Sequence, residues 1–139
     1  MSNLQLSLKT KWFELTKSGA KTEDYRELSD YWIKRLILEP KSYIIGIGST
    51  TSYYFDTIHM LNILNKKSTN YNHYLRRLPE IKFKDFTQNT MTLGYPKSGD
   101  TDRILKLEHK GIKIRTGNPN WGAEPDKLYF VILHGSAVE

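Results

Sequence analysis

Residues 19–27 (GAKTEDYRE) constrain the fold most, because they are mostly polar and their greater part is expected to form a strand. Seven of the nine side chains are charged or hydroxylated, and the segment follows a predicted helix end at Gly19. Successive side chains of a strand point to opposite faces, so Lys21 and Tyr25 share one face while Asp24 and Arg26 share the other. A half-buried strand normally keeps one face apolar. A strand that is polar on both faces therefore predicts the rim of a polar cleft.

Periodic patterns around this segment predict a strand and two short helices. Leucines alternate with polar residues over residues 4–8, which is typical of a half-buried strand. Thr10 is expected to cap a helix that Gly19 ends in a left-handed conformation. Ser29 or Asp30 is expected to cap the second helix. The motif strand, expected over residues 21–28, thus lies between two helices.

After residue 80 the pattern changes to strands separated by turns. Residues 96–100 (PKSGD) have the composition of a turn, and Gly111 is expected to make the next bend. The expected strands cover residues 81–86, 90–95, 104–108, 112–115 and 128–133, and a long loop covers residues 116–126. The last strand is apolar enough to be buried on both faces. This order predicts an α+β fold with a small mixed or antiparallel β-barrel and flanking helices.

Residues 37–80 are expected to be a helical insert within one domain that covers residues 1–139. A chain of 139 residues can bury one substantial core but is short for two. Residues 61–90 hold six basic and two acidic residues, with tyrosines and a histidine among them. Such a mixture suits single-stranded nucleic acid, or it is a solvated basic face. A third interpretation is that the insert binds a protein partner.

The charge balance favours a polyanionic partner without proving one. The chain has 21 basic and 15 acidic residues, a formal net charge of +6 and a pI of about 9.4. The absence of cysteine excludes disulfides, thiolate nucleophiles and zinc–thiolate sites. We expect no signal peptide and no membrane-spanning helix, because the apolar runs are too short. These features predict a cytoplasmic protein.

The motif resembles the hallmark of the ASCH family, a branch of the PUA-like superfamily of small β-barrel domains. That hallmark is a glycine, a lysine, an acidic residue and an arginine, at the spacing of Gly19, Lys21, Asp24 and Arg26. The opening LSLKTKWFELTKSG and the tail GIKIRTGNPNWGAEPDKLYFVI also resemble short ASCH proteins of phages and prophages. The resemblance covers residues 4–36 and 81–135. Glutamate is commoner where this chain has Asp24, so the carboxylate here is one methylene shorter.

The resemblance implies a domain that binds RNA or a modified nucleotide at a basic cleft beside the motif. In this hypothesis Lys9, Lys21 and Arg26 supply positive charge to phosphate or to a base carbonyl, although Arg26 has an alternative role as the partner of Asp24. Tyr25 and Trp121 would stack on a base. The glycines and proline of the tail loop would let it approach a ligand closely. The structural alternatives are an Asp24–Arg26 ion pair that only joins elements, and a Trp121 that only packs on the barrel end.

The second hypothesis is a hydrolase that acts on RNA or on a modified nucleoside without metal. One relative within the ASCH family is an acetylcytidine amidohydrolase, whose active lysine corresponds to Lys21. The threonine nucleophile of that enzyme corresponds to Asp24, which has no hydroxyl, so the amidase mechanism does not transfer intact. A ribonuclease would use Lys21 and Arg26 to stabilise a pentavalent phosphate, with Asp24 or Glu124 as the base. No cofactor is expected. The four histidines show no metal-ligand spacing and are expected to be surface or packing residues.

Overall fold

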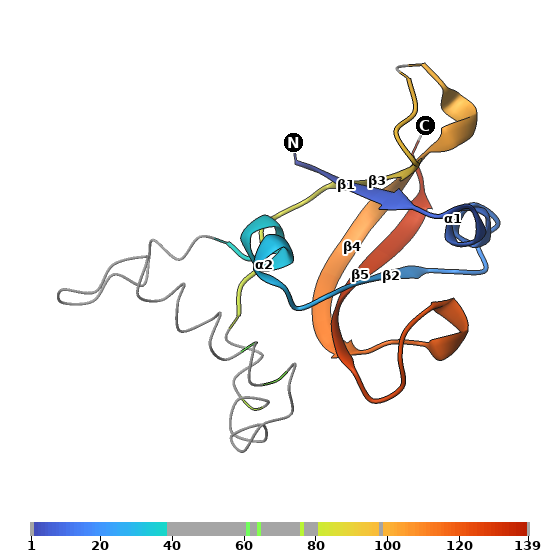
Figure 1. Cartoon of the computed structure of the whole chain (residues 1–139). Helices are drawn as coiled ribbons and strands as arrows, with labels where there is room; N and C mark the ends of the chain where they lie inside the picture. The colour runs from blue at the N-terminus through green and yellow to red at the C-terminus, as the bar shows by residue number, and fades with distance from the viewer. Residues whose placement is uncertain are drawn as a thin grey trace.

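The computed structural model describes residues 2–38, 81–97 and 99–138, together with Leu61, Leu64 and Arg76. In these residues the chain has five strands, two α-helices and two short 3-10 helices (Figure 1). In chain order they are β1 (Asn3–Leu8), α1 (Thr10–Lys17), β2 (Glu23–Arg26), α2 (Asp30–Leu36), β3 (Gln88–Leu93), η3 (Thr101–Arg103), β4 (Ile104–Thr116), η4 (Pro119–Trp121) and β5 (Leu128–Ala137). The predicted α+β class is confirmed. The insert predicted for residues 37–80 lies almost entirely outside the described residues.

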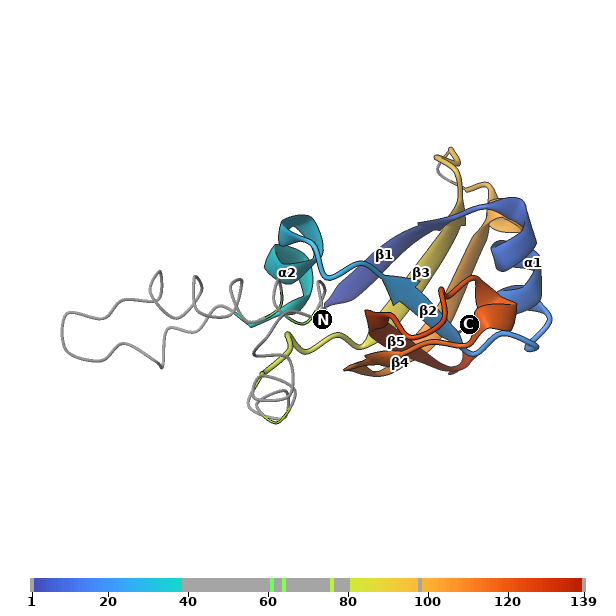
Figure 2. The same cartoon turned by 60° about the horizontal axis from the view of Figure 1, so that its bottom comes forward.

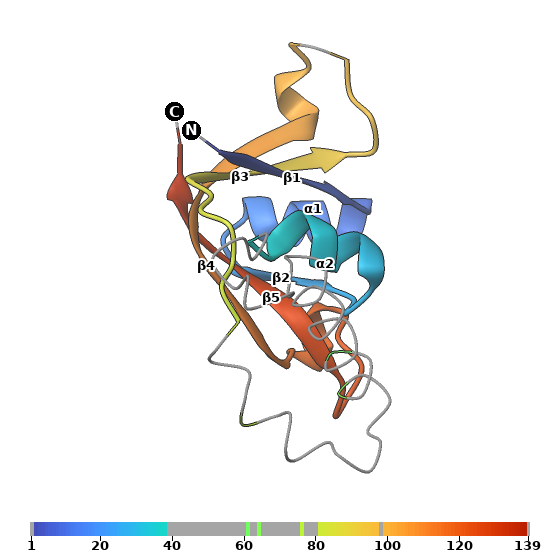
Figure 3. The same ribbon diagram turned by 90° about the vertical axis from the view of Figure 1, so that its left-hand side faces the viewer.

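The five strands form one curled, mixed sheet. Their order is β1-β3-β4-β5-β2, in which β1 is parallel to β3 and the other neighbours are antiparallel. The curl makes a half-barrel, and both helices lie in the opening between its edge strands β1 and β2 (Figures 2 and 3). No helix in the described part of the chain is long and apolar enough to cross a membrane.

The amino-terminal elements follow the predicted pattern closely. Leu4, Leu6 and Leu8 of β1 are buried and alternate with exposed polar residues, as predicted. The helix α1 is capped by Lys9 and not by Thr10, which is already helical, so the predicted cap is wrong by one residue. A threonine oxygen can cap only from outside the helix, because it must reach the amides of the first turn.

The turn after α1 places the motif lysine. Gly19 has a φ of +85°, which is the left-handed conformation predicted for it. The chain then folds back, and the Lys21 amide donates to the Leu15 carbonyl at 3.0 Å. This bond takes the Lys21 amide out of the sheet, so β2 begins at Glu23 and is shorter than the predicted strand. The next helix, α2, is capped by Ser29, whose hydroxyl accepts from the Trp32 amide.

The carboxy-terminal strands differ from the prediction in four places, one of which is that β5 continues beyond its predicted end at residue 133 to Ala137. The strand predicted over residues 81–86 is absent apart from a single bridge between Phe83 and Ile37. The next strand, β3, begins two residues earlier than predicted. The two strands predicted on either side of Gly111 are one strand, β4, because register shifts against β5 near this glycine absorb the bend.

The last strand, β5, separates two apolar clusters. Its residues from Leu128 to Ile132 are all buried, which confirms a strand buried on both faces. Leu128, Phe130 and Ile132 belong to the main core, whereas Tyr129 and Val131 pack with Ala123 in a smaller cluster. Side chains that pair directly across strands share a face. Because Asp24 pairs with Ile132 and Tyr25 with Val131, the motif presents its carboxylate toward the main core and its phenol to the smaller cluster.

Candidate functional site

The side chains of Lys21, Asp24 and Arg26 converge at the junction of α1 and β2. The Asp24 carboxylate accepts from the Arg26 Nε at 2.7 Å through one oxygen, and its other oxygen lies 3.4 Å from the Lys21 Nζ. The Lys21 Nζ also donates to the Glu23 carbonyl at 2.6 Å. One carboxylate therefore joins two cations, and the structure brings together the three groups that the motif suggested.

Lys21 is almost completely buried, with 2% of its surface exposed. Burial lowers the pKa of its ammonium below the usual value, and the neighbouring Asp24 carboxylate opposes that shift only in part. A buried lysine with a lowered pKa beside a cavity is a recognised feature of functional sites. It also fits a structural ion pair, because the same carboxylate compensates the ammonium charge.

Arg26 closes the half-barrel and does not offer its charge to a ligand. Its Nη2 donates to the Ser7 carbonyl of β1 at 3.0 Å, so the guanidinium joins the two edge strands of the sheet. The guanidinium carbon also lies 4.9 Å from the centroid of the Trp32 ring. With its Nε bound to Asp24, Arg26 fits the structural alternative considered for this ion pair. A phosphate-binding role would require these contacts to break.

A cavity of about 250 Å³, called the motif pocket here, lies beside Lys21 and Asp24. Its lining comprises Trp12, Lys21, Asp24, Tyr25, Glu27, Trp121, Gly122, Glu124 and Tyr129. Five of the seven residues suggested by the sequence, namely Lys21, Asp24, Tyr25, Trp121 and Glu124, therefore meet around one hollow. Lys9 and Arg26 are not in the lining, since Lys9 is an exposed helix cap and Arg26 faces β1.

The tail loop forms one wall of the motif pocket by packing on the protein's own aromatic rings. Gly122 has a φ of +96°, and a β-carbon there would lie 2.8 Å from the Trp12 ring. A β-carbon at Gly117 would lie equally close to the Tyr25 ring. These glycines were expected to let the loop approach a ligand. They instead let it approach Trp12 and Tyr25.

Tyr25 is fixed by hydrogen bonds on both sides of its hydroxyl. The oxygen accepts from the Asn118 amide at 2.9 Å, and the hydroxyl donates to a Glu23 carboxylate oxygen at 3.0 Å. Glu23 is also paired with Arg115. Burial is the main reason that the pKa of Tyr25 is raised to about 12. The two hydrogen bonds hold the Tyr25 ring in a fixed position in the wall of the motif pocket.

The charge of the motif pocket differs from the predicted basic cleft. Its lining holds three carboxylates and a single ammonium group. Glu27 and Glu124 are exposed at 53% and 72% of their side chains, and Lys127 lies near both, with its Nζ 2.8 Å from Glu27 and 3.9 Å from Glu124. The hydrogen bond to Glu27 raises the pKa of Lys127. The expectation of a basic cleft at the motif is thus wrong, because Arg26 is used internally and Lys9 lies elsewhere.

A buried polar network that the sequence did not indicate lies between β3, β4 and β5. The Asn89 side chain is fully buried, and it bonds the ring nitrogens Nδ1 of His109 and of His134 at 2.7 Å each. Burial lowers the pKa of His134 to about 4 and lowers that of His109, so both rings are neutral at pH 7. Nε2 of His134 is buried and has no hydrogen-bond partner. Only the β4–β5 register, not the spacing of 25 residues, brings the two histidines together.

Two aromatic residues of the motif pocket were not among the expected site residues. Trp12 of α1 lies partly exposed in the lining, and Tyr129 belongs to the strand that was expected to be buried on both faces. No local signal distinguishes them from core aromatics. Among the described residues, no three His, Asp or Glu side chains form a group that could hold a metal ion.

Comparisons with protein-family models, with curated proteins and with solved structures found no match to this chain.

Proposed function

We propose that this protein is an ASCH-like domain of the PUA-like superfamily that binds RNA or a nucleotide through one base held in the motif pocket. The observation that carries the proposal is the meeting of Trp12, Trp121 and Tyr25 around the Lys21–Asp24 pair. Aromatic rings bind the faces of a base by stacking, and fixed polar groups bind its edge. The motif pocket supplies both kinds of group in one hollow.

The size of the motif pocket supports a single base or nucleoside as the ligand. Pockets for drug-sized ligands have volumes of about 300–1,000 Å³. A volume of about 250 Å³ lies just below that range. A folded RNA element or a run of stacked bases would not fit, so the proposed ligand enters as one unstacked base.

The charges of the motif pocket support recognition of the base and not of a phosphate. Glu27 and Glu124 would repel a phosphate at the mouth, whereas carboxylates accept hydrogen bonds from an exocyclic amino group such as N4 of cytosine. In this proposal Asp24 and Glu124 accept hydrogen bonds from the exocyclic amino group, and Lys21 donates to a carbonyl oxygen of the base. We therefore expect cytidine or adenosine to bind more tightly than uridine.

Isothermal titration calorimetry with nucleosides tests this proposal. Cytidine is expected to bind more tightly than uridine, and Trp121→Ala is expected to weaken cytidine binding about 5- to 150-fold, since a base–aromatic stack contributes about 1–3 kcal/mol. Leu38→Ala is the control, because Leu38 is 47% exposed and lies in neither of the two hollows. Equal affinities for all nucleosides, or equal losses in both variants, would contradict the proposal.

A second candidate function is metal-independent hydrolysis of RNA or of a modified nucleoside. The observation in its favour is the almost complete burial of the Lys21 ammonium at the wall of the motif pocket, because burial lowers the pKa of this group and favours the neutral amine that a general base requires. Asp24 would orient that amine, to which it already lies 3.4 Å away.

Incubation with labelled RNA and with acetylated cytidine, in the presence of a chelator, tests the hydrolase. Product that disappears in Lys21→Met and is retained in Lys113→Gln, a change at an exposed lysine outside the motif pocket, would favour the enzyme over the binding module. If the wild type releases no product from either substrate while it still binds cytidine, only the binding function stands.

A further inference from the structure

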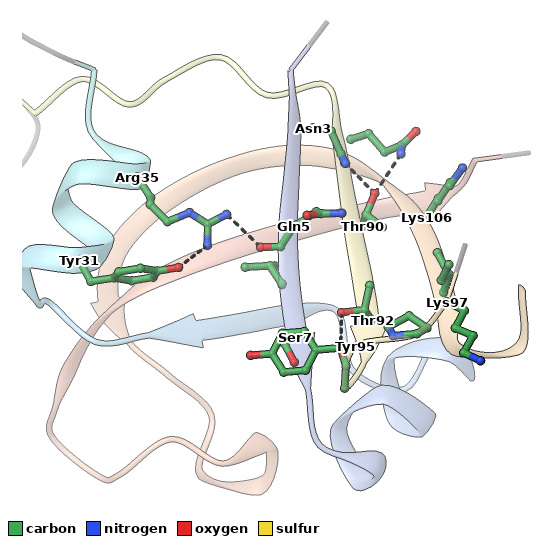
Figure 4. Close-up of a pocket in the computed structure, with 15 residues that line it drawn as sticks. Asn3, Gln5, Ser7, Tyr31, Arg35, Thr90, Thr92, Tyr95, Lys97 and Lys106 are labelled. Atoms are coloured by element: carbon green, nitrogen blue, oxygen red, sulfur yellow. Dashed lines mark hydrogen bonds between the residues drawn. The ribbon is translucent and has the colours of Figure 1, made fainter. Parts of the chain in front are cut away.

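A second, larger hollow lies on the outer face of β1 and β3, with a volume of about 830 Å³ (Figure 4). We call it the sheet groove. Its floor consists of alternate residues of β1 and β3, which share a face through the parallel register of these strands: Asn3, Gln5, Ser7, Gln88, Thr90 and Thr92. Tyr31 and Arg35 of α2 border it on one side, and residues of the turn between β3 and β4 border it on the other. It shares no lining residue with the motif pocket.

Among the residues that the structure describes, the lining of the sheet groove carries only positive charge. Its charged members are Arg35, Lys97 and Lys106, and none of the described lining residues is a carboxylate. None of the three cations is ion-paired with a described residue, and Lys97 and Lys106 are exposed. Glu108, the next acidic residue along this face of β4, is already bound by Lys110 and by the Ser136 amide. Unpaired cations on a polar floor are complementary to a polyanion.

Arg35 is held in position for a ligand without being neutralised. Its Nη1 donates to the Tyr31 hydroxyl at 3.1 Å, and its Nη2 donates to the Gln5 carbonyl of β1 at 3.2 Å. Its guanidinium carbon lies 4.9 Å from the centroid of the Trp32 ring. A guanidinium has five N–H donors, so these contacts leave others available to an anion. The contacts reduce the conformational entropy that the side chain would lose on binding.

Two exposed tyrosines lie along the same hollow. Tyr95 has 98% and Tyr31 has 61% of its surface exposed. Tyr95 follows Gly94 in the turn after β3 and lines the same hollow as Ser7 of β1 (Figure 4). Tyr31 is braced edge-on by Trp32, with 5.1 Å between the ring centroids. Exposed rings beside a cationic groove are the usual platform for single-stranded nucleic acid, because every base has a face that can stack.

We infer that the sheet groove binds a short stretch of single-stranded nucleic acid. Phosphates contact Lys97, Lys106 and Arg35, a base stacks on Tyr95, and the amides and hydroxyls of the floor accept or donate to sugar and base edges. The floor from Asn3 to Ser7 is about 13 Å long at the usual strand rise, which spans about four stacked nucleotides. This inference rests on the proposed function only in taking nucleic acid as the ligand class, since no residue is shared between the two sites.

Fluorescence anisotropy with a labelled ten-nucleotide uridine oligomer, and with its deoxyuridine counterpart, tests the inference. The affinity is expected to fall with salt, and the double variant Lys97→Gln/Lys106→Gln is expected to reduce the salt slope by about 1.4, because each phosphate contact on a single strand contributes about 0.7. Tyr95→Ala is expected to weaken binding about 5- to 150-fold. Lys113→Gln is the charge control, since Lys113 is exposed and lies outside both hollows.

The two oligomers distinguish RNA from DNA as the ligand, and either result supports binding of single-stranded nucleic acid at the sheet groove. Tighter binding of the uridine oligomer assigns contacts to the 2′-hydroxyl, whereas equal binding assigns the affinity to phosphate and base faces. Three results would overturn the inference. They are no binding at low salt, the same slope change in Lys113→Gln as in the double variant, and competition by heparin together with no effect of Tyr95→Ala.

The motif pocket is tested separately in the same experiments. If the double variant loses oligomer binding but keeps cytidine binding, both proposals stand. If Trp121→Ala keeps cytidine binding while the groove variants lose the oligomer, the proposed function fails and the sheet groove remains. If the groove variants keep oligomer binding while Trp121→Ala loses it, the strand binds at the motif pocket and the inference about the sheet groove is wrong.

Discussion

The motif pocket and the sheet groove use charge in opposite ways. In the motif pocket, Lys21 and Asp24 are buried against each other, and Arg26 is bound to the same carboxylate and to β1. In the sheet groove, Lys97 and Lys106 lie on the surface without a carboxylate partner among the described residues. The charges of the motif stabilise the fold and shape a hollow, whereas those of the groove stay available to a polyanion. The richest cluster of charged residues in the sequence is therefore not the region best suited to bind phosphate.

The difference has a physical cause. A buried charge needs a partner, because desolvation costs several kcal/mol per ion and only a close opposite charge offsets it. An exposed lysine keeps its water and gains little from an ion pair. Side chains at the start of an edge strand such as β2 are enclosed by α1 and the tail loop, so their charges must be paired. Charged side chains around the exposed face of β1 remain hydrated and do not need a charged partner.

The largest effect is expected from Asp24→Ala. This change leaves the ammonium of Lys21, which is 2% exposed, without its carboxylate, and it also frees Arg26. Removing one partner of a buried ion pair costs about 3–5 kcal/mol. Urea unfolding should show this loss, while Lys106→Gln in the sheet groove should change the free energy of unfolding by less than about 0.5 kcal/mol. A loss below about 1 kcal/mol for Asp24→Ala would mean that the motif charges are not stabilising.

The next effect is the dependence of stability on pH. Because the pKa of folded His134 is about 4, below the usual 6.5, the unfolded chain binds more protons between these values. The stability is therefore complete above pH 6.5 and falls by about 3 kcal/mol as the pH drops toward 4. Burial lowers the pKa of His109 in the same direction. Urea unfolding from pH 7 to pH 4.5 measures the change.

The variant His134→Asn is expected to flatten this profile. Asparagine keeps an oxygen near the position of Nδ1, where Asn89 donates, and it does not titrate. The sheet groove provides the contrast, since its described lining residues include no histidine or carboxylate, and its affinity for the oligomer should not change over the same range. An unchanged profile in His134→Asn would assign the pH dependence to another group.

A smaller effect is expected from Gly122→Ala. The left-handed φ of +96° and a β-carbon 2.8 Å from the Trp12 ring together should cost about 1–3 kcal/mol and move Trp12 or the loop. Gly99→Ala is the matched control, because Gly99 has a φ of +88° with nothing near its β-carbon position. The excess loss in Gly122→Ala, measured by urea unfolding, reports the contact, and cytidine affinity should fall only in that variant. Equal losses would mean that the loop adjusts freely.

The smallest change in stability is expected from Tyr95→Ala. A side chain that is 98% exposed contributes little to the core, so the free energy of unfolding should stay within about 0.5 kcal/mol. The same variant should lose affinity for the uridine oligomer, which would separate binding from folding at this residue. Thermal unfolding and anisotropy on one protein preparation measure both quantities. A large loss of stability would mean that Tyr95 packs on the protein and is not a stacking platform.

Local patterns predicted much of the fold. The alternation of residues 4–8, the left-handed Gly19 and the Ser29 cap depend on neighbours within a few residues, and each is present in the structure. The strand predicted over residues 81–86 is absent, because alternation alone does not supply a partner strand. The bend at Gly111 became an irregularity within β4, since pairing with β5 continues on both sides of it.

The candidate sites depended on more distant contacts. The spacing of Lys21, Asp24 and Arg26 placed them together, because all three lie within six residues of one another. That spacing did not reveal that Arg26 would bind the Ser7 carbonyl of β1, which closes the half-barrel and removes its charge from the cleft. The sheet groove had no sequence signal at all, since Asn3, Gln88 and Lys106 are adjacent only through the parallel pairing of β1 with β3 and the antiparallel pairing of β3 with β4.

Side-chain chemistry and short-range periodicity were thus enough to predict the class of the fold, the end of α1, the cap of α2 and the meeting of the motif charges. Whether each charge is buried and paired or exposed and available depends on which strands become neighbours and on how the sheet curls. Those outcomes arise from contacts between residues far apart in the chain, whose free energy exists only when the whole core has formed. For this reason the tertiary structure, and not the motif, decides that the motif charges are buried and paired, whereas those of the sheet groove have no ion-pair partner among the described residues.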